Sequence, residues 1–116
     1  SVFTHMAVDE IGHYMLEIKR VLKPGGLCLS TFFIYNRENE VLISTTNHFT
    51  FPIKKSNYRL MSNEVQSANI ALSEDLLNEL IDGAGLKKIS TVEGYWKDTI
   101  SKSTEKDFQD IVILEA

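Results

Sequence analysis

Hydrophobic residues recur at helical spacing along residues 7–22. The apolar positions follow one another at intervals of three or four and comprise Val8, Ile11, Met15, Ile18 and Leu22. Acidic side chains come early in this segment and basic side chains late, an arrangement that suits the helix dipole. The pattern predicts an amphipathic helix that ends before Pro24, because proline disfavours helical backbone at the residue that precedes it.

A nearly continuous apolar run follows at Leu27–Ile34, interrupted only by Ser30 and Thr31. A strand with this pattern is covered on both faces, as happens in parallel sheets. The helix, the turn at Gly25-Gly26 and this strand together resemble the second half of a βαβ unit. We therefore expect an α/β fold class.

Residues 35–72 show no clear period and contain scattered aromatic residues among many Asn, Ser and Thr residues. Short strands are expected in this segment, since a structureless loop of such length is unusual in a compact domain. The ranges that favour strands are Asn47–Ile53, Tyr58–Leu60 and Ala68–Leu72.

Ser73 precedes a second helical pattern over Glu74–Asp82, and its hydroxyl is expected to cap that helix. One of the glycines that follow should take the left-handed conformation that ends a helix. Two further strands are predicted at Leu86–Tyr95 and Phe108–Ala116, joined by a polar connector. The second of these strands holds the longest apolar run in the chain, which favours a place inside the sheet.

The composition is that of an ordinary globular domain, with 43% apolar and 24% charged residues among 116. A net charge of −4 without a basic run argues against nucleic-acid binding. No apolar stretch is long enough to span a membrane. The single cysteine, Cys28, excludes an internal disulfide and fits a reducing compartment, so a cytoplasmic location is expected.

Four segments of the chain resemble the C-terminal half of class I S-adenosylmethionine-dependent methyltransferases. The most specific is the helix-to-strand junction Glu17–Gly26, which reads Glu-Ile-Lys-Arg-Val-Leu-Lys-Pro-Gly-Gly. The others are Ser1–Met6, Ser73–Leu86 and the closing pair of Gly94–Trp96 and Phe108–Val112. Together they cover nearly the whole chain except the 35–72 segment.

The resemblance implies that residues 1–116 form a partial Rossmann-like methyltransferase domain, from the end of strand four to strand seven. Its sheet core would consist of the family's strands five, seven and six with flanking helices, so that Phe108–Ala116 lies between Leu27–Ile34 and Leu86–Tyr95. The 35–72 segment would be an insertion on the substrate side. The implied activity is transfer of a methyl group from S-adenosylmethionine to a small-molecule acceptor by in-line displacement.

The glycine-rich turn with which this family holds its cofactor is absent from the sequence. No Gly-x-Gly-x-Gly occurs, and Gly25-Gly26 precedes a strand instead of following one. Most of the cofactor site would then belong to a part of the protein outside this chain, and the isolated chain would be inactive and bind S-adenosylmethionine weakly or not at all. The resemblance assigns Ser1 and Phe3, at the end of the family's fourth strand, to the remaining cofactor wall.

Candidate substrate-binding residues follow the carboxyl ends of predicted strands, where α/β sheets form their ligand crevices. Tyr35 and Asn36 lie just past the Leu27–Ile34 strand. Tyr58 and Trp96 could add an apolar lid or floor, although core packing is the commoner role of a tryptophan.

His5 is the candidate for proton transfer and also for substrate binding, because it follows the end of a presumed strand. A polar position at a helix entry is the alternative role for this residue. His5, His13 and His48 share no metal-ligand spacing, so no metal site is predicted.

Two other interpretations come from different classes of protein. The chain could be an inactive remnant or an interaction module that self-associates through the open edge of the Leu27–Ile34 strand. Aromatic residues of the 35–72 segment, namely Phe49, Phe51 and Tyr58, are the local alternative for covering that edge. Half of a dinucleotide-dependent oxidoreductase is the third interpretation, and the Phe-Gln-Asp-Ile-Val-Ile ending argues against it.

Overall fold

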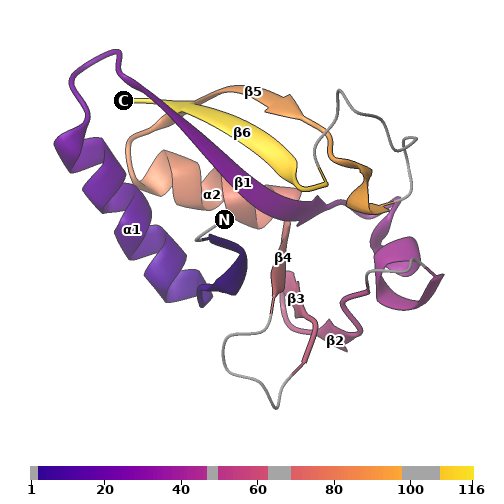
Figure 1. Cartoon of the computed structure of the whole chain (residues 1–116). Helices are drawn as coiled ribbons and strands as arrows, with labels where there is room; N and C mark the ends of the chain where they lie inside the picture. Colours follow the sequence, from indigo (N-terminus) through magenta and orange to yellow (C-terminus); the bar gives the residue numbers. More distant parts are fainter. Residues whose placement is uncertain (1–2, 47–49, 63–68, 98–107) are drawn as a thin grey trace.

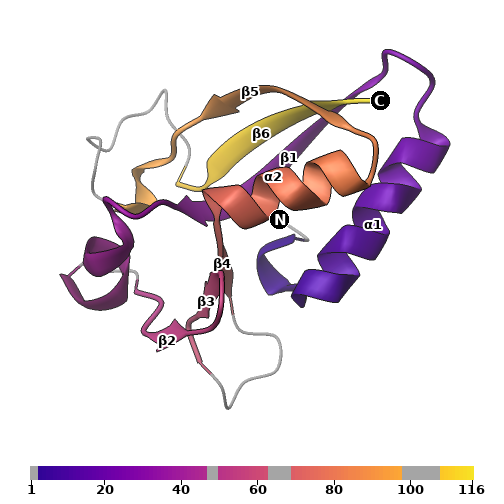
Figure 2. The same cartoon turned by 180° about the vertical axis from the view of Figure 1, so that it is seen from behind.

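The computed structural model describes residues 3–46, 50–62, 69–97 and 108–116 of the chain. In these ranges six strands form one mixed sheet in the order β2-β3-β4-β1-β6-β5. The strands are β1 (Leu27–Tyr35), β2 (Ile53–Lys54), β3 (Tyr58–Leu60), β4 (Ile70–Ser73), β5 (Lys87–Val92) and β6 (Asp110–Glu115). The helices α1 (Val8–Val21) and α2 (Glu74–Gly83) cover one face of the sheet, as the opposite views in Figures 1 and 2 show. The fold is thus an α/β mixed sheet with helices, as the sequence predicted at the level of class.

Helix α1 has nearly the predicted bounds, and its buried residues belong to the predicted stripe. The Glu10 carboxylate accepts a hydrogen bond from the Ala7 N–H at 3.1 Å and closes the first turn. After the helix, Gly25 has a φ of +81°, a conformation that glycine adopts without strain. Its N–H donates to the carbonyl of Ala116 at 3.0 Å, so this turn is tied to the end of β6.

The main hydrophobic core lies between the helices and the sheet face that they cover. It includes Ile11 and Met15 of α1, Leu77 and Ile81 of α2, Phe32 and Ile34 of β1, and Val112 and Leu114 of β6. A second, smaller cluster lies around the carboxyl end of β1 and comprises Phe33, Tyr35, Ile43, Phe51, Ala71 and Trp96.

Strand β1 is covered on both faces only along its carboxyl half. Phe32 and Ile34 join the main core, whereas Phe33 and Tyr35 join the second cluster. Along the amino half, Leu27 and Leu29 are 61% and 67% exposed. The prediction of a strand covered on both faces is therefore wrong for this half, because the second cluster is too small to reach it.

Strand β6 lies between β1 and β5 and is antiparallel to both. Its residues from Glu115 back to Asp110 pair with Leu27–Phe32 of β1. This placement confirms the predicted neighbours of the last strand. Burial alternates along β6, with Val112 and Leu114 facing the core. An inner position in the sheet accounts for the apolar character of this strand.

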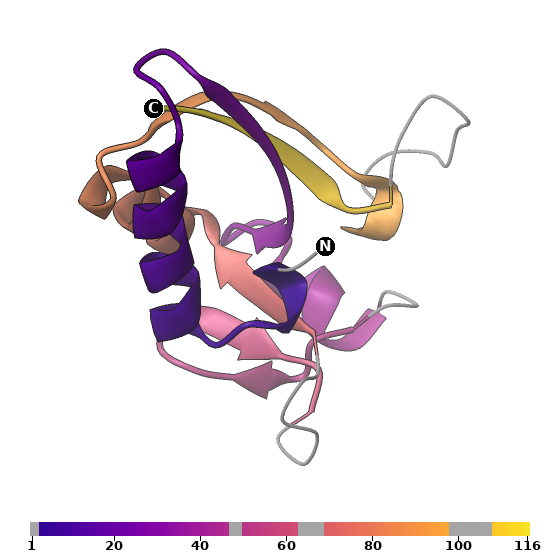
Figure 3. The ribbon, with the colours of Figure 1, turned by 60° about the vertical axis from the view of Figure 1, so that its left-hand side comes forward.

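The 35–72 segment adds three strands to the sheet, which the expected three-stranded core did not include. Strand β4 pairs in parallel with the end of β1, with Phe33 opposite Ala71 and Tyr35 opposite Ser73. Strands β3 and β2 then extend the sheet by antiparallel pairing. Figure 3 shows β1, β6 and β5 arching over one end of the molecule, with β2, β3 and β4 at the other. The segment thus covers part of the open edge of β1 by backbone pairing.

Three predicted strands differ from the structure. Only the last residue of the Asn47–Ile53 range, Ile53, is in a strand, and residues 47–49 lie outside the described part. Strand β5 ends at Val92, and a 3-10 turn follows at Tyr95–Lys97 because side-chain hydrogen bonds hold the backbone there. Phe3, expected at a strand end, begins a 3-10 turn over Phe3–His5.

Candidate functional site

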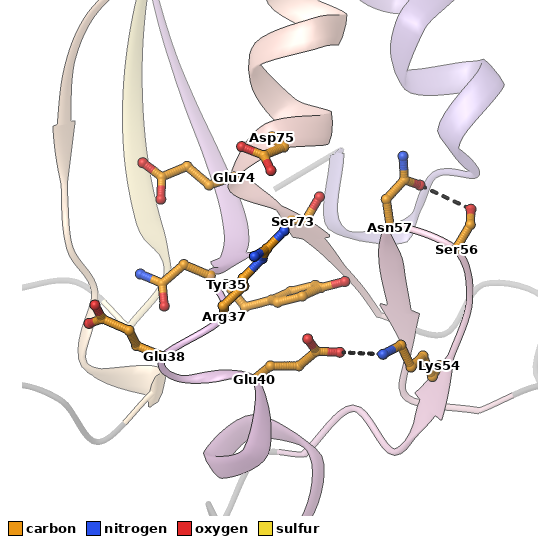
Figure 4. Close-up of a pocket in the computed structure, with 11 residues that line it drawn as sticks. Tyr35, Arg37, Glu38, Glu40, Lys54, Ser56, Asn57, Ser73, Glu74 and Asp75 are labelled. Carbon is orange, nitrogen blue, oxygen red and sulfur yellow. Dashed lines mark hydrogen bonds and ion pairs between the residues drawn. The ribbon is translucent and has the colours of Figure 1, made fainter.

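A cavity of about 430 Å³ opens at the carboxyl end of β1. It is bounded by the turn after β1, the β2–β3 hairpin and the first turn of α2 (Figure 4). The lining residues are Tyr35, Asn36, Arg37, Glu38, Glu40, Lys54, Ser56, Asn57, Ser73, Glu74 and Asp75. All but the tyrosine carry small polar or charged side chains, so the cavity is suited to a polar ligand.

The parallel pairing of β1 with β4 creates this site. Both strands end at the same edge of the sheet, and β4 runs directly into α2 at Ser73. The Ser73 hydroxyl accepts a hydrogen bond from the Leu76 N–H at 3.1 Å, which confirms the predicted cap. As a result the positive end of the α2 dipole faces the same space as the end of β1.

Tyr35 is the most enclosed residue of the lining, with 4% of its surface exposed. Its ring belongs to the second hydrophobic cluster, and its hydroxyl points into the cavity among the labelled side chains of Figure 4. Burial, with the nearby negative charge of Glu40, raises the pKa of this phenol to about 12 although Arg59 opposes the shift. The hydroxyl is therefore protonated at neutral pH and can donate a hydrogen bond.

The turn after β1 is held by two reciprocal hydrogen bonds. The Asn36 N–H donates to Asn39 Oδ1 at 2.8 Å, and the Asn39 N–H donates to Asn36 Oδ1 at 3.1 Å. These bonds use the carbonyl oxygen of the Asn36 amide and leave its NH₂ group able to contact a ligand. They also set Arg37 and Glu38 at the tip of the turn, where both are exposed.

One wall of the cavity is fixed by a buried arginine. The Arg59 guanidinium donates to the Phe51 carbonyl at 2.8 Å and to Glu40 Oε2 at 2.7 Å. Lys54 Nζ lies 3.5 Å from the same Glu40 oxygen. Arg59 is buried, and these hydrogen bonds fix the orientation of its guanidinium group. Arg59 therefore holds Glu40 in place at the cavity rim.

The predicted site residues fall into three separate places. Tyr35 and Asn36 line the cavity described above, and His5, Tyr58 and Trp96 are not among its lining residues. His5 and Tyr58 line a different, smaller cavity of about 150 Å³ beside the start of α1. Trp96 is buried in the second cluster, and its ring nitrogen donates a hydrogen bond to Asp110 Oδ2 at 2.9 Å.

The two residues assigned to the cofactor wall have different outcomes. Ser1 lies outside the described residues. Phe3 is buried in the main core and stacks on Phe32 with ring centroids 4.8 Å apart. Its side chain is therefore used for packing, and a ligand could reach only its main chain.

A buried carboxylate, Asp110, was not predicted. It is 1% exposed and accepts hydrogen bonds from the Ile34 N–H, the Gly94 N–H and the indole of Trp96 at 2.8–2.9 Å. Lys97 Nζ lies 3.5 Å from Asp110 Oδ1, the oxygen that accepts from the Gly94 N–H. Burial raises the pKa of this carboxyl group, and the charge of Lys97 and the three donors only partly offset the effect. An aspartate directly before the apolar run of β6 was the one sequence signal for this site.

Most of the cavity residues were also not predicted. Glu40, Lys54, Glu74 and Asp75 come from three elements that approach one another only when β4 pairs with β1. The residues around each of them in the sequence indicate only an ordinary polar surface position. Their assembly depends on long-range pairing that no local pattern contains.

Within the described ranges, no group of three or more His, Cys, Asp or Glu side chains is arranged to hold a metal ion. Neither α1 nor α2 has the length and apolar character needed to cross a membrane, and no other described helix has them either. No family model matches the chain. No solved structure matches it either.

Proposed function

We propose that this chain forms the acceptor-binding side of a class I S-adenosylmethionine-dependent methyltransferase domain. The observation that carries the proposal is the arrangement β1-β6-β5, with β6 reversed between its neighbours and a polar cavity at the carboxyl end of β1. The sequence resemblance implies that order of strands. Ligands of open α/β sheets also bind outside the carboxyl ends of the strands.

The described residues that were candidates for cofactor contact are used in other contacts of the fold. Gly25 and Gly26 lie between α1 and β1, at the end of β1 away from the cavity, and the Gly25 N–H is already bonded to Ala116. The side chain of Phe3 is buried in the core. The proposal therefore places the cofactor-binding turn in another part of the same protein.

The chain's own contribution would be to bind and orient the methyl acceptor. In-line methyl transfer depends on holding two reactants in line and on excluding water, and it needs no covalent enzyme nucleophile. The Tyr35 hydroxyl can donate to an acceptor oxygen, while Glu40 is fixed by Arg59 and Lys54 at the rim. His5 lies in the other, smaller cavity, so Tyr35 is the better candidate for contact with the acceptor.

The first experiment is a comparison of two proteins. We expect the parent reading frame to encode a Gly-x-Gly-x-Gly turn before Ser1, and its product to bind S-adenosylmethionine in calorimetry and to transfer labelled methyl groups to small molecules. The 116-residue chain alone should bind the cofactor weakly or not at all. A parent protein without that turn and without cofactor binding would contradict the proposal.

An interaction module is the second candidate. It is favoured by the exposed Leu27 and Leu29 of β1, which alternate with the core residues Phe32 and Ile34 and so lie on the sheet face opposite the helices. Strand β1 also has no strand partner along Leu27–Phe32 on its β4 side within the described residues. This candidate would be supported by self-association of the chain.

A further inference from the structure

The Tyr35 residue is enclosed, but its hydroxyl is accessible from the cavity that it lines. The residue is nearly fully enclosed, yet its hydroxyl makes no hydrogen bond to any residue in the described part of the chain. Buried polar side chains in folded proteins nearly always have a partner, from the protein, from water or from a ligand. The hydroxyl of this enclosed side chain is therefore open to a partner in the cavity, either water or a ligand atom.

This hydroxyl acts as a donor. Burial and the charge of Glu40 oppose ionisation, so the group stays neutral well above physiological pH. A neutral phenol can donate a hydrogen bond to an uncharged oxygen, such as a hydroxyl or a carbonyl. The charges around it then decide which ligand is preferred.

Carboxylates outnumber cations in the lining by four to two. Glu40 and Lys54 pair with each other, and Glu40 also pairs with Arg59. The three other carboxylates, Glu38, Glu74 and Asp75, make no ion pair with any described residue, and Arg37 is the remaining cation. The unpaired charge of the cavity is thus negative, which attracts a positively charged ligand.

We infer that this cavity binds a small polar molecule that carries a protonated amine together with an oxygen atom that accepts a hydrogen bond from Tyr35. The amine would lie among the unpaired carboxylates at the start of α2 and in the turn after β1. The inference rests on the proposed function only in taking this molecule as the methyl acceptor.

The experiment titrates the 116-residue chain with three hexoses and no cofactor. Glucosamine, glucose and glucuronate share a ring and differ in charge, and at mildly acidic pH the amine is protonated. Binding is followed by amide chemical shifts in two-dimensional NMR spectra. We expect glucosamine to bind tightest and glucuronate weakest, with the largest shifts at Tyr35, Asn36 and Ser73–Asp75. Tightest binding of glucuronate, or no shifts at these residues with any probe, would overturn the inference.

Variants separate the hydroxyl from the charges. Tyr35→Phe removes only the hydroxyl and should weaken glucosamine binding about three- to tenfold. Tyr58→Phe is the matched control, because Tyr58 lines the other cavity, and it should leave binding unchanged. The pair Glu74→Gln and Asp75→Asn should weaken glucosamine binding more than glucose binding.

Equal effects of the two tyrosine variants would contradict the role of Tyr35. Loss of binding in Tyr35→Phe counts as support only if its NMR spectrum keeps the chemical-shift dispersion of the unsubstituted 116-residue chain. Because S-adenosylmethionine takes no part, a negative result here leaves the methyltransferase proposal open, and a failed methyltransferase assay leaves this one open.

Discussion

Tyr35 and Asp110 are both buried polar residues near the end of β1, but they differ in their hydrogen-bond partners. Asp110 is provided with three N–H donors and the ammonium group of Lys97. The Tyr35 hydroxyl meets no such partner among the described residues and lines the cavity instead. At the residue scale, therefore, Asp110 holds the structure together, whereas Tyr35 is available for binding.

Replacing Asp110 by alanine should destabilise the fold strongly. The change leaves the N–H groups of Ile34 and Gly94 and the indole of Trp96 without their acceptor in a buried place. We expect the free energy of unfolding to fall by about 3–5 kcal/mol, measured by urea denaturation. Glu79→Ala, at an exposed position of α2, is the control and should change it by less than about 0.5 kcal/mol. A small effect of Asp110→Ala would show that water replaces the carboxylate.

The raised pKa of Tyr35 should affect stability at alkaline pH. Its phenol should ionise at about 12, above the ordinary value near 10 for tyrosine, because burial and Glu40 disfavour the phenolate. Between these two values the folded chain holds the proton more tightly than the unfolded chain. The stability that Tyr35 contributes is thus present below about pH 10 and is lost as the pH rises towards 12.

Ultraviolet titration of phenolate absorbance tests this prediction. The difference between the chain and its Tyr35→Phe variant should show one titration step near 12. Stability of the unsubstituted chain should also decline relative to the variant over the same alkaline range. A difference curve with its midpoint at the ordinary tyrosine value would contradict the desolvation of the Tyr35 side chain.

At the scale of elements, the sheet is assembled from two pieces that meet at β1. One piece is the antiparallel pair β6 and β5, and the other is the β2–β3–β4 unit from the 35–72 segment. The connection between β5 and β6 passes through the turn at Tyr95–Lys97, which Asp110 binds through the Gly94 N–H. This turn should therefore tolerate little change in its backbone.

Gly94→Ala tests that expectation, and Gly83→Ala at the end of α2 is a control with an expected effect of opposite sign. A Cβ at Gly94 would lie 2.5 Å from the carbonyl oxygen of Gln109, a backbone contact that must shift. Gly94→Ala should lower the free energy of unfolding by about 1–3 kcal/mol. A Cβ at Gly83, at the end of α2, meets nothing within 4 Å. Gly83→Ala should raise it by about 0.5–1 kcal/mol, because alanine favours helix.

Thermal and urea unfolding of both variants measure these changes. If Gly94→Ala is as stable as the parent chain, the backbone of Tyr95–Lys97 and the residues before β6 must be able to separate. A loss of stability in Gly83→Ala would mean that this residue does not keep its helical conformation.

At the scale of the whole molecule, the helices cover one sheet face and leave part of the other exposed. The exposed part includes Leu27 and Leu29, next to the stretch of β1 that has no described strand on its β4 side. Exposed apolar surface beside an open strand edge favours association. The short contact with β4 covers only Phe33–Tyr35.

Sedimentation of the 116-residue chain over a range of concentrations tests association. We expect the average mass to rise with concentration, and Leu29→Lys to suppress that rise, since a charge cannot be buried there without cost. Because Leu29 is largely exposed, the variant should fold as stably as the parent chain. A chain that stays monomeric throughout would show that β4 and the 35–72 segment suffice to cover the edge.

The elements with a regular spacing of apolar residues could be predicted from the local sequence. Helices α1 and α2 and strands β1 and β6 follow from spacing and from the cap at Ser73, because such patterns depend on neighbours in the sequence. The place of β6 between β1 and β5 agrees with the order that the resemblance implies. The class of fold and two residues of the cavity, Tyr35 and Asn36, were therefore available from the sequence alone.

Only the tertiary structure decided how the remaining residues come together. The parallel pairing of β4 with β1 joins residues nearly forty positions apart and builds the cavity, and it separates His5 and Tyr58 from Tyr35. Asp110 gains its role from donors on β1 and on the turn after β5. These contacts form only when the whole chain packs, because open strand edges and buried polar groups must then be paired. The residues that pair are far apart in the sequence.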